Sequence, residues 1–258
     1  MRRPMSPSEP SLRPPGDEEL ERYFRIVRSE GIYPIPGNLR FLARALFEGV
    51  PIGGRSVLEI GGGNGSLSFY AACAGARRVV CLEPQAAGSS DRNRRQFDVL
   101  AARLQRPEVV LVRESIQEFD PRGERFDILM LNASINHLDE EACVRLRDDA
   151  ASRDRYRALF RKMAAMIPPG GQLVATDCSR YNALGSIGLR NPLARFIDWR
   201  KHQEPRLWAR LLEEAGFGSP RIGWLSLSAL RAPGRFLFGN VVGAFFLGGP
   251  FRLVMTRG

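Results

Sequence analysis

The stretch Arg55-Ser-Val-Leu-Glu-Ile-Gly-Gly-Gly-Asn-Gly65 decides the fold of this 258-residue chain. It predicts a short buried strand that contains the acidic Glu59, followed at once by a glycine-rich turn. The alternate glycines of that turn are Gly61, Gly63 and Gly65. Glycine tolerates positive φ and lets a ligand approach the bare main chain. A helix predicted from Ser66 to Ala76 points its unpaired N–H groups to the same place, so the stretch predicts a small-molecule site.

A dinucleotide is the closest alternative ligand for such a turn. Its fingerprint is G-x-G-x-x-G, with an acidic residue about twenty positions further along the chain. Here the third glycine falls at Gly65, and Ser66 stands where the fingerprint requires glycine. Glu59, directly before the turn, is also foreign to that pattern. An NAD(P)-dependent oxidoreductase is therefore an alternative that the motif disfavours.

Further strand-like runs follow the glycine turn, and helical stretches alternate with them. The runs are Arg78–Glu83, Val109–Val112, Phe126–Leu131, the strand entered through Ile167–Leu173, Arg221–Leu225 and Phe251–Thr256. Such alternation predicts an α/β chain whose parallel sheet carries helices on both faces. Ligands of these sheets bind at the carboxyl ends of the strands, where the predicted turns lie.

The pattern E-x-G-x-G-x-G at Glu59–Gly65 resembles the first motif of class I S-adenosylmethionine-dependent methyltransferases. Other markers follow in the order of that family: the acid Glu83, the turn Ile167-Pro-Pro-Gly-Gly-Gln-Leu173, and the helix end Leu211-Leu-Glu-Glu-Ala-Gly-Phe217. The resemblance spans residues 55–217. It implies a Rossmann-like three-layer sandwich with a mostly parallel seven-stranded sheet and an antiparallel last strand.

The resemblance also implies S-adenosyl-L-methionine as the cofactor. The residues expected around it are Glu59, Gly61, Gly63, Gly65, Glu83, Glu114, Ser115, Ile116, Asn132 and Ala133. Glu83 would accept hydrogen bonds from the two ribose hydroxyls. The turn at 114–116 would hold the adenine by a carboxylate, a backbone N–H and an apolar side chain, although Asp is the commoner residue at its first position. The backbone of Asn132 and Ala133 would hold the amino group.

Methyl transfer to a hydroxyl needs a base, and the chain has two histidines, His137 and His202. His137 follows the fourth predicted strand, where members of the family approach the methyl group, so it is the predicted catalytic base. The alternative is a structural histidine that caps a helix starting at Leu138. Asp177, at the end of the fifth predicted strand, is expected to face the mouth of the cleft.

One methyltransferase domain is predicted over residues 17–258. Residues 1–16 are rich in Pro and Ser and are predicted to be a disordered tail. Two helices are expected within 17–50, the first from Asp17 and the second with Asn38 as its N-cap. Residues 138–166 are predicted to be helical with a break at Asp148–Asp149, and Met163 and Met166 are assigned to the core.

Two insertions, 181–204 and 226–250, are expected to cap the substrate cleft. The second mixes aromatic residues with glycine and is too short to span a bilayer of ~20 apolar residues. Contact with an anionic membrane surface is the alternative for this segment.

Charge and cysteine content limit the partners and the compartment. The chain carries a net charge of +10, and residues 180–258 hold twelve basic against four acidic residues. Such a segment suits an acidic substrate, an anionic membrane surface or nucleic acid, or is a solvated surface. The four cysteines show neither C-x-x-C pairing nor metal spacing, and no secretory signal is evident. We therefore expect free thiols, no metal and a cytoplasmic protein.

These observations predict an S-adenosylmethionine-dependent methyltransferase that acts on a small-molecule, lipid-like or glycan acceptor, at oxygen. An RNA or DNA methyltransferase is one alternative, but Asn132-Ala-Ser-Ile lacks the N-P-P-Y motif of many base-directed enzymes. No added RNA-binding module is evident either, so no nucleic-acid partner is expected. The other alternative is a non-catalytic protein that binds the cofactor.

Overall fold

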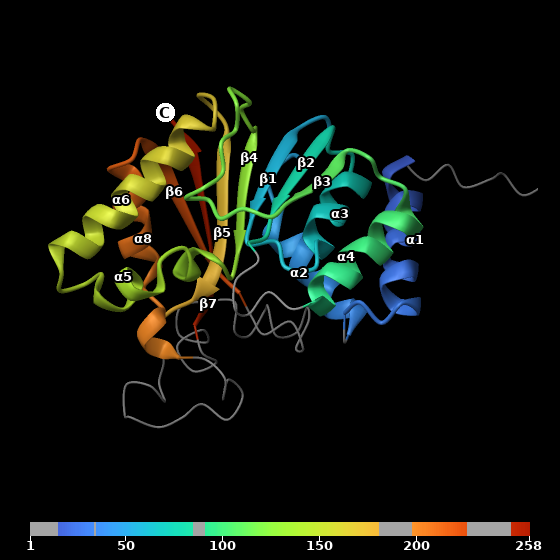
Figure 1. The fold of residues 1–258 in the computed structure, drawn as a ribbon, viewed down its shortest axis with the longest axis horizontal. Coiled ribbons are helices and arrows are strands. Elements are labelled where there is room, and N and C mark those ends of the chain that lie inside the picture. The colour runs from blue at the N-terminus through green and yellow to red at the C-terminus, as the bar shows by residue number, and fades with distance from the viewer. Residues whose placement is uncertain (1–14, 34, 85–90, 181–197, 226–248) are drawn as a thin grey trace, which may run out of the picture.

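The computed structural model describes residues 15–33, 35–84, 91–180, 198–225 and 249–258, and its fold is drawn in Figure 1. The helices are α1 (Pro15–Ser29), α2 (Pro36–Leu46), α3 (Ser66–Cys73), α4 (Asp91–Leu104), α5 (Glu140–Arg145), α6 (Ala150–Ala165) and α8 (Pro205–Glu213), with 3-10 turns η1 (Ile135–His137) and η2 (Trp199–Lys201). The strands are β1 (Ser56–Ile60), β2 (Arg78–Leu82), β3 (Val109–Val112), β4 (Ile128–Asn132), β5 (Gln172–Cys178), β6 (Phe217–Trp224) and β7 (Pro250–Arg257).

The strands form one seven-stranded sheet in the order β3-β2-β1-β4-β5-β7-β6. Strands β1 to β5 pair in parallel, whereas β7 runs antiparallel to both β5 and β6. This confirms the predicted Rossmann-like sheet with an antiparallel last strand. The chain builds outward from β1 to β3 and then returns to place β4 on the other side of β1. The crevice at the carboxyl ends of β1 and β4 is therefore the switch point where such sheets bind ligands.

Helices cover both faces of the sheet, as predicted (Figure 1). Successive strand residues point to opposite faces, so Val57 joins the core that contains α1–α4, while Leu58 joins the core with α5, α6 and α8. Fully buried Trp208 fills the second of these cores. Met163 and Met166 are buried there as well, which confirms their assignment to the core.

The two N-terminal helices begin earlier than the sequence predicted. Helix α1 starts at Pro15, two residues before Asp17, and thus overlaps the end of the predicted tail. Helix α2 starts at Pro36 with Ile35 as its N-cap, so the prediction of Asn38 as N-cap is wrong. The physical reason is Pro36: its fixed φ suits the first turn of a helix, where its missing N–H is not needed.

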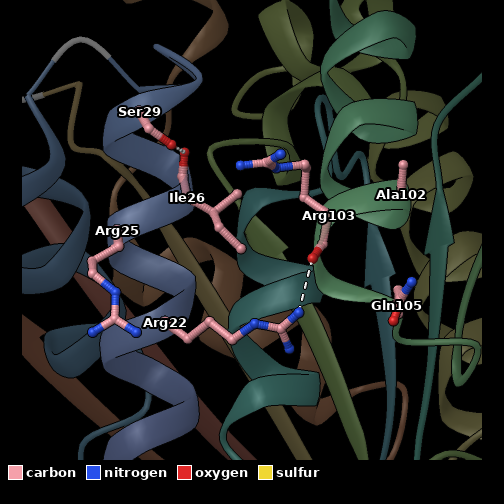
Figure 2. A pocket seen from close by; sticks show the side chains of 7 residues that line it. All are labelled: Arg22, Arg25, Ile26, Ser29, Ala102, Arg103 and Gln105. Atoms are coloured by element: carbon pink, nitrogen blue, oxygen red, sulfur yellow. Dashed lines mark hydrogen bonds between the residues drawn. The ribbon is translucent and has the colours of Figure 1, made fainter.

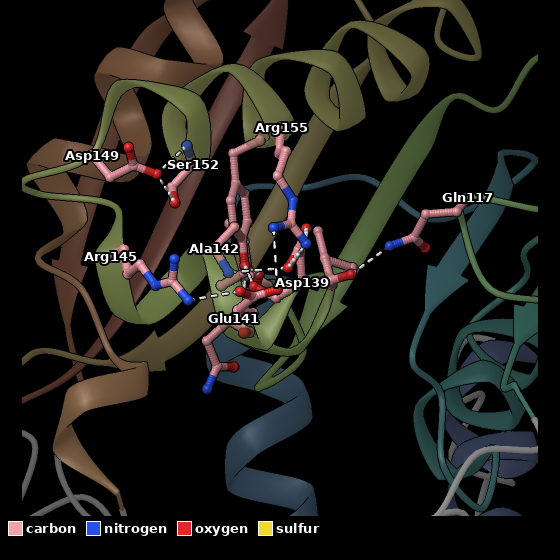
Figure 3. A network of polar contacts seen from close by, with 12 residues as sticks. Gln117, Asp139, Glu141, Ala142, Arg145, Asp149, Ser152 and Arg155 are labelled. Atoms are coloured by element: carbon pink, nitrogen blue, oxygen red, sulfur yellow. Dashed lines mark hydrogen bonds and ion pairs between the residues drawn. The ribbon is translucent and has the colours of Figure 1, made fainter.

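The predicted break in the helical segment 138–166 is confirmed, and aspartates begin both helices around it. The Asp149 side chain accepts from the N–H of Ser152 at 2.8 Å and thereby caps α6. Asp139 caps α5 by accepting from the N–H of Ala142 at 3.0 Å. Figure 3 shows these caps beside the ion pair of Asp139 with Arg155. The expected cap at His137 is wrong, because His137 ends η1 and Asp139 takes that role.

The edge strand β6 begins at Phe217, four residues before the predicted Arg221. Most of its residues are exposed, and its pairing with β7 shifts register between Gly218 and Arg221. Ser219 takes a positive φ of 52° in that bulge. An exposed, bulged strand lacks the apolar alternation from which strands are predicted, which explains the missed start.

Several predictions fall outside the described residues. They are the disordered tail up to residue 14 and the insertions over 181–197 and 226–248, with their capping or membrane-surface role. Within the described residues, no helix is long and apolar enough to cross a membrane. The four cysteines are free thiols, as expected, with Cys73, Cys81 and Cys143 buried.

Candidate functional site

The glycine turn sits at the carboxyl end of β1, between the sheet and the N-terminus of α3. Gly61, Gly63 and Gly65 have φ values of 74°, 56° and 74°, which only glycine adopts readily. The N–H groups of Gly61 and Gly62 both donate to the carbonyl of Leu82, at 2.8 and 3.0 Å. The turn is therefore held against the end of β2 by its backbone, and its alternate glycines are a conformational requirement.

Close packing explains why side chains are excluded from this turn. A Cβ on Gly62 would overlap Sγ of Cys81, and one on Gly61 would lie 2.7 Å from Cβ of Ser134. A Cβ on Gly65 would overlap the ring of Phe97. The turn thus offers bare main chain to a ligand above it.

Glu59 lies beneath the turn rather than in it. Its side chain is buried, and Oγ of Ser68 in α3 donates to its Oε2. Burial raises the pKa of the Glu59 carboxyl to about 7, against the lowering effect of the Ser68 hydrogen bond. Glu59 therefore ties β1 to α3 below the predicted cofactor, and a proton on it is compatible with neutral pH.

Glu83 stands at the end of β2 beside the turn, half-buried. The N–H of Gly63 donates to its Oε2 at 2.8 Å, and its own N–H donates to the carbonyl of Val112 at 3.0 Å. The carboxylate is thereby fixed over the glycine turn. The half-buried carboxylate of Glu83 can accept hydrogen bonds from the ribose of S-adenosylmethionine. The bare main chain beside it suits the methionine end of the same molecule.

The predicted adenine turn is only partly arranged as expected. Glu114 is exposed, whereas Ile116 is buried in the core next to Phe119. The N–H of Ser115 donates to Oε2 of Glu118 at 3.0 Å, and its Oγ donates to the same atom at 2.7 Å. An adenine ring would have to replace Glu118 to take that N–H. Glu118 was not predicted as part of this turn, although Ser115-Ile-Gln-Glu118 has the spacing of a capping box.

Asn132 ends β4 and Ala133 follows it, next to the glycine turn. Oδ1 of Asn132 accepts from Oγ1 of Thr176 at 2.8 Å, and the N–H of Ala133 donates to the Thr176 carbonyl at 2.9 Å. Ala133 takes a positive φ of 52°, and Oγ of Ser134 donates to the carbonyl of Ile60 at 2.5 Å. The loop after β4 is therefore tied to both of its neighbouring strands, at the switch point of the sheet.

A family model described as a methyltransferase domain matches residues 31–218. This match covers well over half of the chain and includes the glycine turn, Glu83 and the ends of β3, β4 and β5. The chain belongs to the class I S-adenosylmethionine-dependent methyltransferase family.

Solved structures of methyltransferases share its fold. A candidate S-adenosylmethionine-dependent methyltransferase from Listeria monocytogenes has a TM-score of 0.56 at 12% identity, over 86% of this chain and 98% of that one. One from Mesorhizobium loti has a TM-score of 0.55 at 16% identity, over 84% and 96%. The geranyl diphosphate C-methyltransferase from Streptomyces coelicolor A3(2), in complex with S-adenosyl-L-homocysteine, has 0.56 at 14%, over 84% and 78%. A comparison with curated proteins finds no match.

The predicted base of this methyltransferase, His137, lies on the surface after β4. Its side chain is 53% exposed, and its Nδ1 lies 2.6 Å from Oε1 of Glu140. Lys201 binds the other oxygen of Glu140 at 2.5 Å. His137 is thus part of an exposed ion-pair network, and its catalytic role stays a prediction.

The structure brings Asp177 together with His202, a pairing that was not predicted from the sequence. Asp177 is buried instead of facing an open cleft mouth, so that expectation is wrong. Its Oδ1 lies 2.8 Å from Nδ1 of His202 and also accepts from the N–H of Cys178 at 2.7 Å. No local pattern links two residues that come from β5 and from the turn before α8.

A surface pocket of about 520 Å³ lies apart from these strand ends, between α1 and α4 (Figure 2). It is lined by Arg22, Arg25, Ile26, Ser29, Ala102, Arg103 and Gln105. These residues lie near the C-terminal end of α4, whereas Gln96, nearer its start, bonds Asn64 of the glycine turn. The pocket is therefore not the predicted cofactor site.

Proposed function

We propose that this protein transfers the methyl group of S-adenosylmethionine to an oxygen atom of a small-molecule, lipid-like or glycan acceptor. The observation that carries the proposal is the carboxylate of Glu83 fixed beside a turn of bare main chain. A dinucleotide would place its pyrophosphate on the helix N-terminus. The dinucleotide fingerprint also has an acid about twenty positions along, but it requires glycine where this chain has Ser66, and S-adenosylmethionine needs no pyrophosphate site.

The cofactor contacts follow from the positions of the strand ends. Glu83 would bind the ribose hydroxyls, the turn at 114–116 the adenine, and the Asn132–Ala133 backbone the amino group. Members of the family approach the methyl group after the fourth strand, so the acceptor would meet the cofactor near the ends of β4 and its neighbour β5. When bound, the cofactor supplies an activated methyl group, so the protein contributes alignment and exclusion of water.

An oxygen acceptor requires a group that takes its proton as the new bond forms. Imidazole suits this task near neutral pH, and both histidines of the chain lie at this edge of the sheet. His137 is the residue that the sequence predicts for the role. His202 is the second imidazole, and it is the one held by a buried carboxylate.

The acceptor class is supported by charge and by one structural neighbour. The net charge of +10 favours an acceptor with anionic groups. The neighbour from Streptomyces coelicolor A3(2) methylates geranyl diphosphate, an apolar chain with an acidic head. That enzyme methylates a carbon atom. The structural similarity to it therefore supports an amphiphilic acceptor, but it does not support oxygen as the acceptor atom. A cytoplasmic site of action, with contact to an anionic membrane face, belongs to this proposal.

A transfer assay with methyl-labelled S-adenosylmethionine tests the proposal. The wild-type protein is incubated with separated lipid, glycan and small-phenol fractions of a cell extract, with RNA and DNA as further arms. We expect the methyl label in the lipid, glycan or small-phenol fraction. The labelled product should resist cleavage, as a methyl ether does. Label only in nucleic acid, or no label in any arm from protein that binds the cofactor, would contradict the proposal.

A further inference from the structure

The strongest unassigned feature of the molecule is the buried pair at the end of β5. The side chain of Asp177 is 1% exposed and that of His202 is 13% exposed. Nδ1 of His202 is the ring nitrogen that meets the buried carboxylate, so Nε2 is the nitrogen on the opposite edge of the ring. A carboxylate at Nδ1 holds the proton on that nitrogen and leaves the lone pair of Nε2 available.

Buried polar atoms without a hydrogen-bond partner occur in Asp177 itself, in the residue that follows His202 and in η1. Among the described residues they include Oδ2 of Asp177, Oε1 of Gln203 and both amide atoms of Asn136. Each unsatisfied buried group costs about 1–3 kcal/mol, so native proteins keep few of them. Asn136 belongs to η1, which packs on β5, and its carbonyl accepts from Tyr156. Several such atoms gathered at one place are characteristic of a site that a ligand or water completes.

The position of the pair on the sheet relates it to the cofactor. Asn132 at the end of β4 pairs in register with Thr176 of β5, so Asp177 is one residue beyond that level. Strand β5 is next to β4 and two strands from β1. Adjacent strands lie about 4.8 Å apart, which places the end of β5 roughly 10 Å from the glycine turn. The pair therefore lies beside the end of β4, where the acceptor is expected to approach the cofactor.

We propose that His202 is the catalytic base of this methyltransferase and that Asp177 is its positioning residue; the inference rests on the proposed function. Nε2 of His202 takes the proton of the acceptor hydroxyl as the oxygen–carbon bond forms. The bond between the methyl carbon and sulfur breaks, and its electron pair stays on sulfur as a neutral thioether. The positive charge passes from the sulfonium to the imidazolium, where the Asp177 carboxylate balances it.

Two ionisable side chains next to the pair, Cys143 and Tyr156, do not compete with His202 as a base. Burial raises the pKa of the Cys143 thiol to about 12 and that of the Tyr156 hydroxyl well above its ordinary value. The charged Arg180 also lies close to this thiol. The imidazole of His202 is therefore the group in this cluster that can take the proton of an oxygen acceptor.

Chemical labelling of the wild-type protein tests the proposal without any substitution. Diethyl pyrocarbonate reacts with an accessible imidazole lone pair, and mass spectrometry distinguishes the chain's two histidines. We expect labelling of His202, loss of methyl transfer in proportion to that labelling, and recovery of both with hydroxylamine. Failure of His202 to react, or inactivation that follows His137 labelling instead, would overturn the proposal.

Substitutions separate the two roles. His202→Gln should lower kcat at least a hundredfold while the affinity for S-adenosylmethionine, measured by calorimetry, stays within twofold. Asp177→Asn should move the acid limb of the pH–rate profile to lower pH, because the imidazolium loses its countercharge. Full turnover in His202→Gln, or a hundredfold loss in His137→Gln alone, would overturn the role of His202. Absence of transfer by the wild-type protein would contradict the proposed function itself, and the role of His202 with it.

Discussion

Gly62 shows how one missing side-chain carbon shapes the cofactor turn. Because a Cβ there would overlap Sγ of Cys81, Gly62→Ala must displace a buried strand residue. Overpacking of this kind costs about 1–3 kcal/mol of unfolding free energy. Urea unfolding should show this loss in Gly62→Ala and none beyond about 0.5 kcal/mol in Gly53→Ala, whose added Cβ meets open space. If the cause is steric, adding Cys81→Ala to Gly62→Ala should restore part of the lost stability. The packing account is wrong if Gly62→Ala is as stable as the wild type.

Glu59 makes a prediction about stability and pH. Its carboxyl is protonated in the folded chain up to a pKa of about 7, whereas the unfolded chain loses that proton near 4.5. Between these values the folded state binds more protons, so the free energy of unfolding falls as pH rises. This loss of unfolding free energy reaches about 3 kcal/mol and is complete above pH 7. Urea unfolding at pH 5 and pH 8 should show a smaller fall in Glu59→Gln than in the wild type, and equal falls would contradict the assignment.

At the scale of the element, the start of α6 rests on one side chain. Asp149 accepts from both the N–H and Oγ of Ser152, so Asp149→Ala removes the N-cap. The thermal midpoint should fall by about 2–4 °C, the usual effect of a lost cap in a domain of this size. Asp148→Ala is the matched control, since exposed Asp148 does not cap the helix. Equal midpoints for the two variants would show that the cap does not stabilise α6.

Elements were predictable where a local pattern fixes them. The apolar strand before Gly61, the break at Asp149 and the helix that ends within Leu211–Phe217 were all confirmed. The pattern failed at Pro36, where φ geometry outweighed a good capping residue two positions later. It failed again at β6, because Ser219 and its neighbours form an exposed bulge without alternation. Propensity and periodicity carry no information about such tertiary pairing.

At the scale of the molecule, the site was predictable only as far as strand ends and motifs define it. The sequence placed Glu83 beside the glycine turn, and the Gly63 hydrogen bond supports that position. It could not foresee that Glu59 would bond Ser68 or that Asp177 would meet His202. Those contacts depend on how separate elements pack, and no spacing in the chain encodes them.

Binding of S-adenosylmethionine to the glycine turn is the central claim, and titration calorimetry with its product S-adenosylhomocysteine tests it most directly. We predict saturable one-to-one binding, with no heat from NAD. Glu83→Gln should weaken binding at least tenfold, because hydrogen bonds to a charged acceptor contribute about 1.5–3 kcal/mol. Glu124 lies at the other end of the strands, where it pairs with Arg78 at the start of β2. Glu124→Gln should therefore bind the ligand as the wild type does. A folded wild-type protein that gives no heat with S-adenosylhomocysteine, or a Glu83→Gln variant that binds it unchanged, would contradict the account.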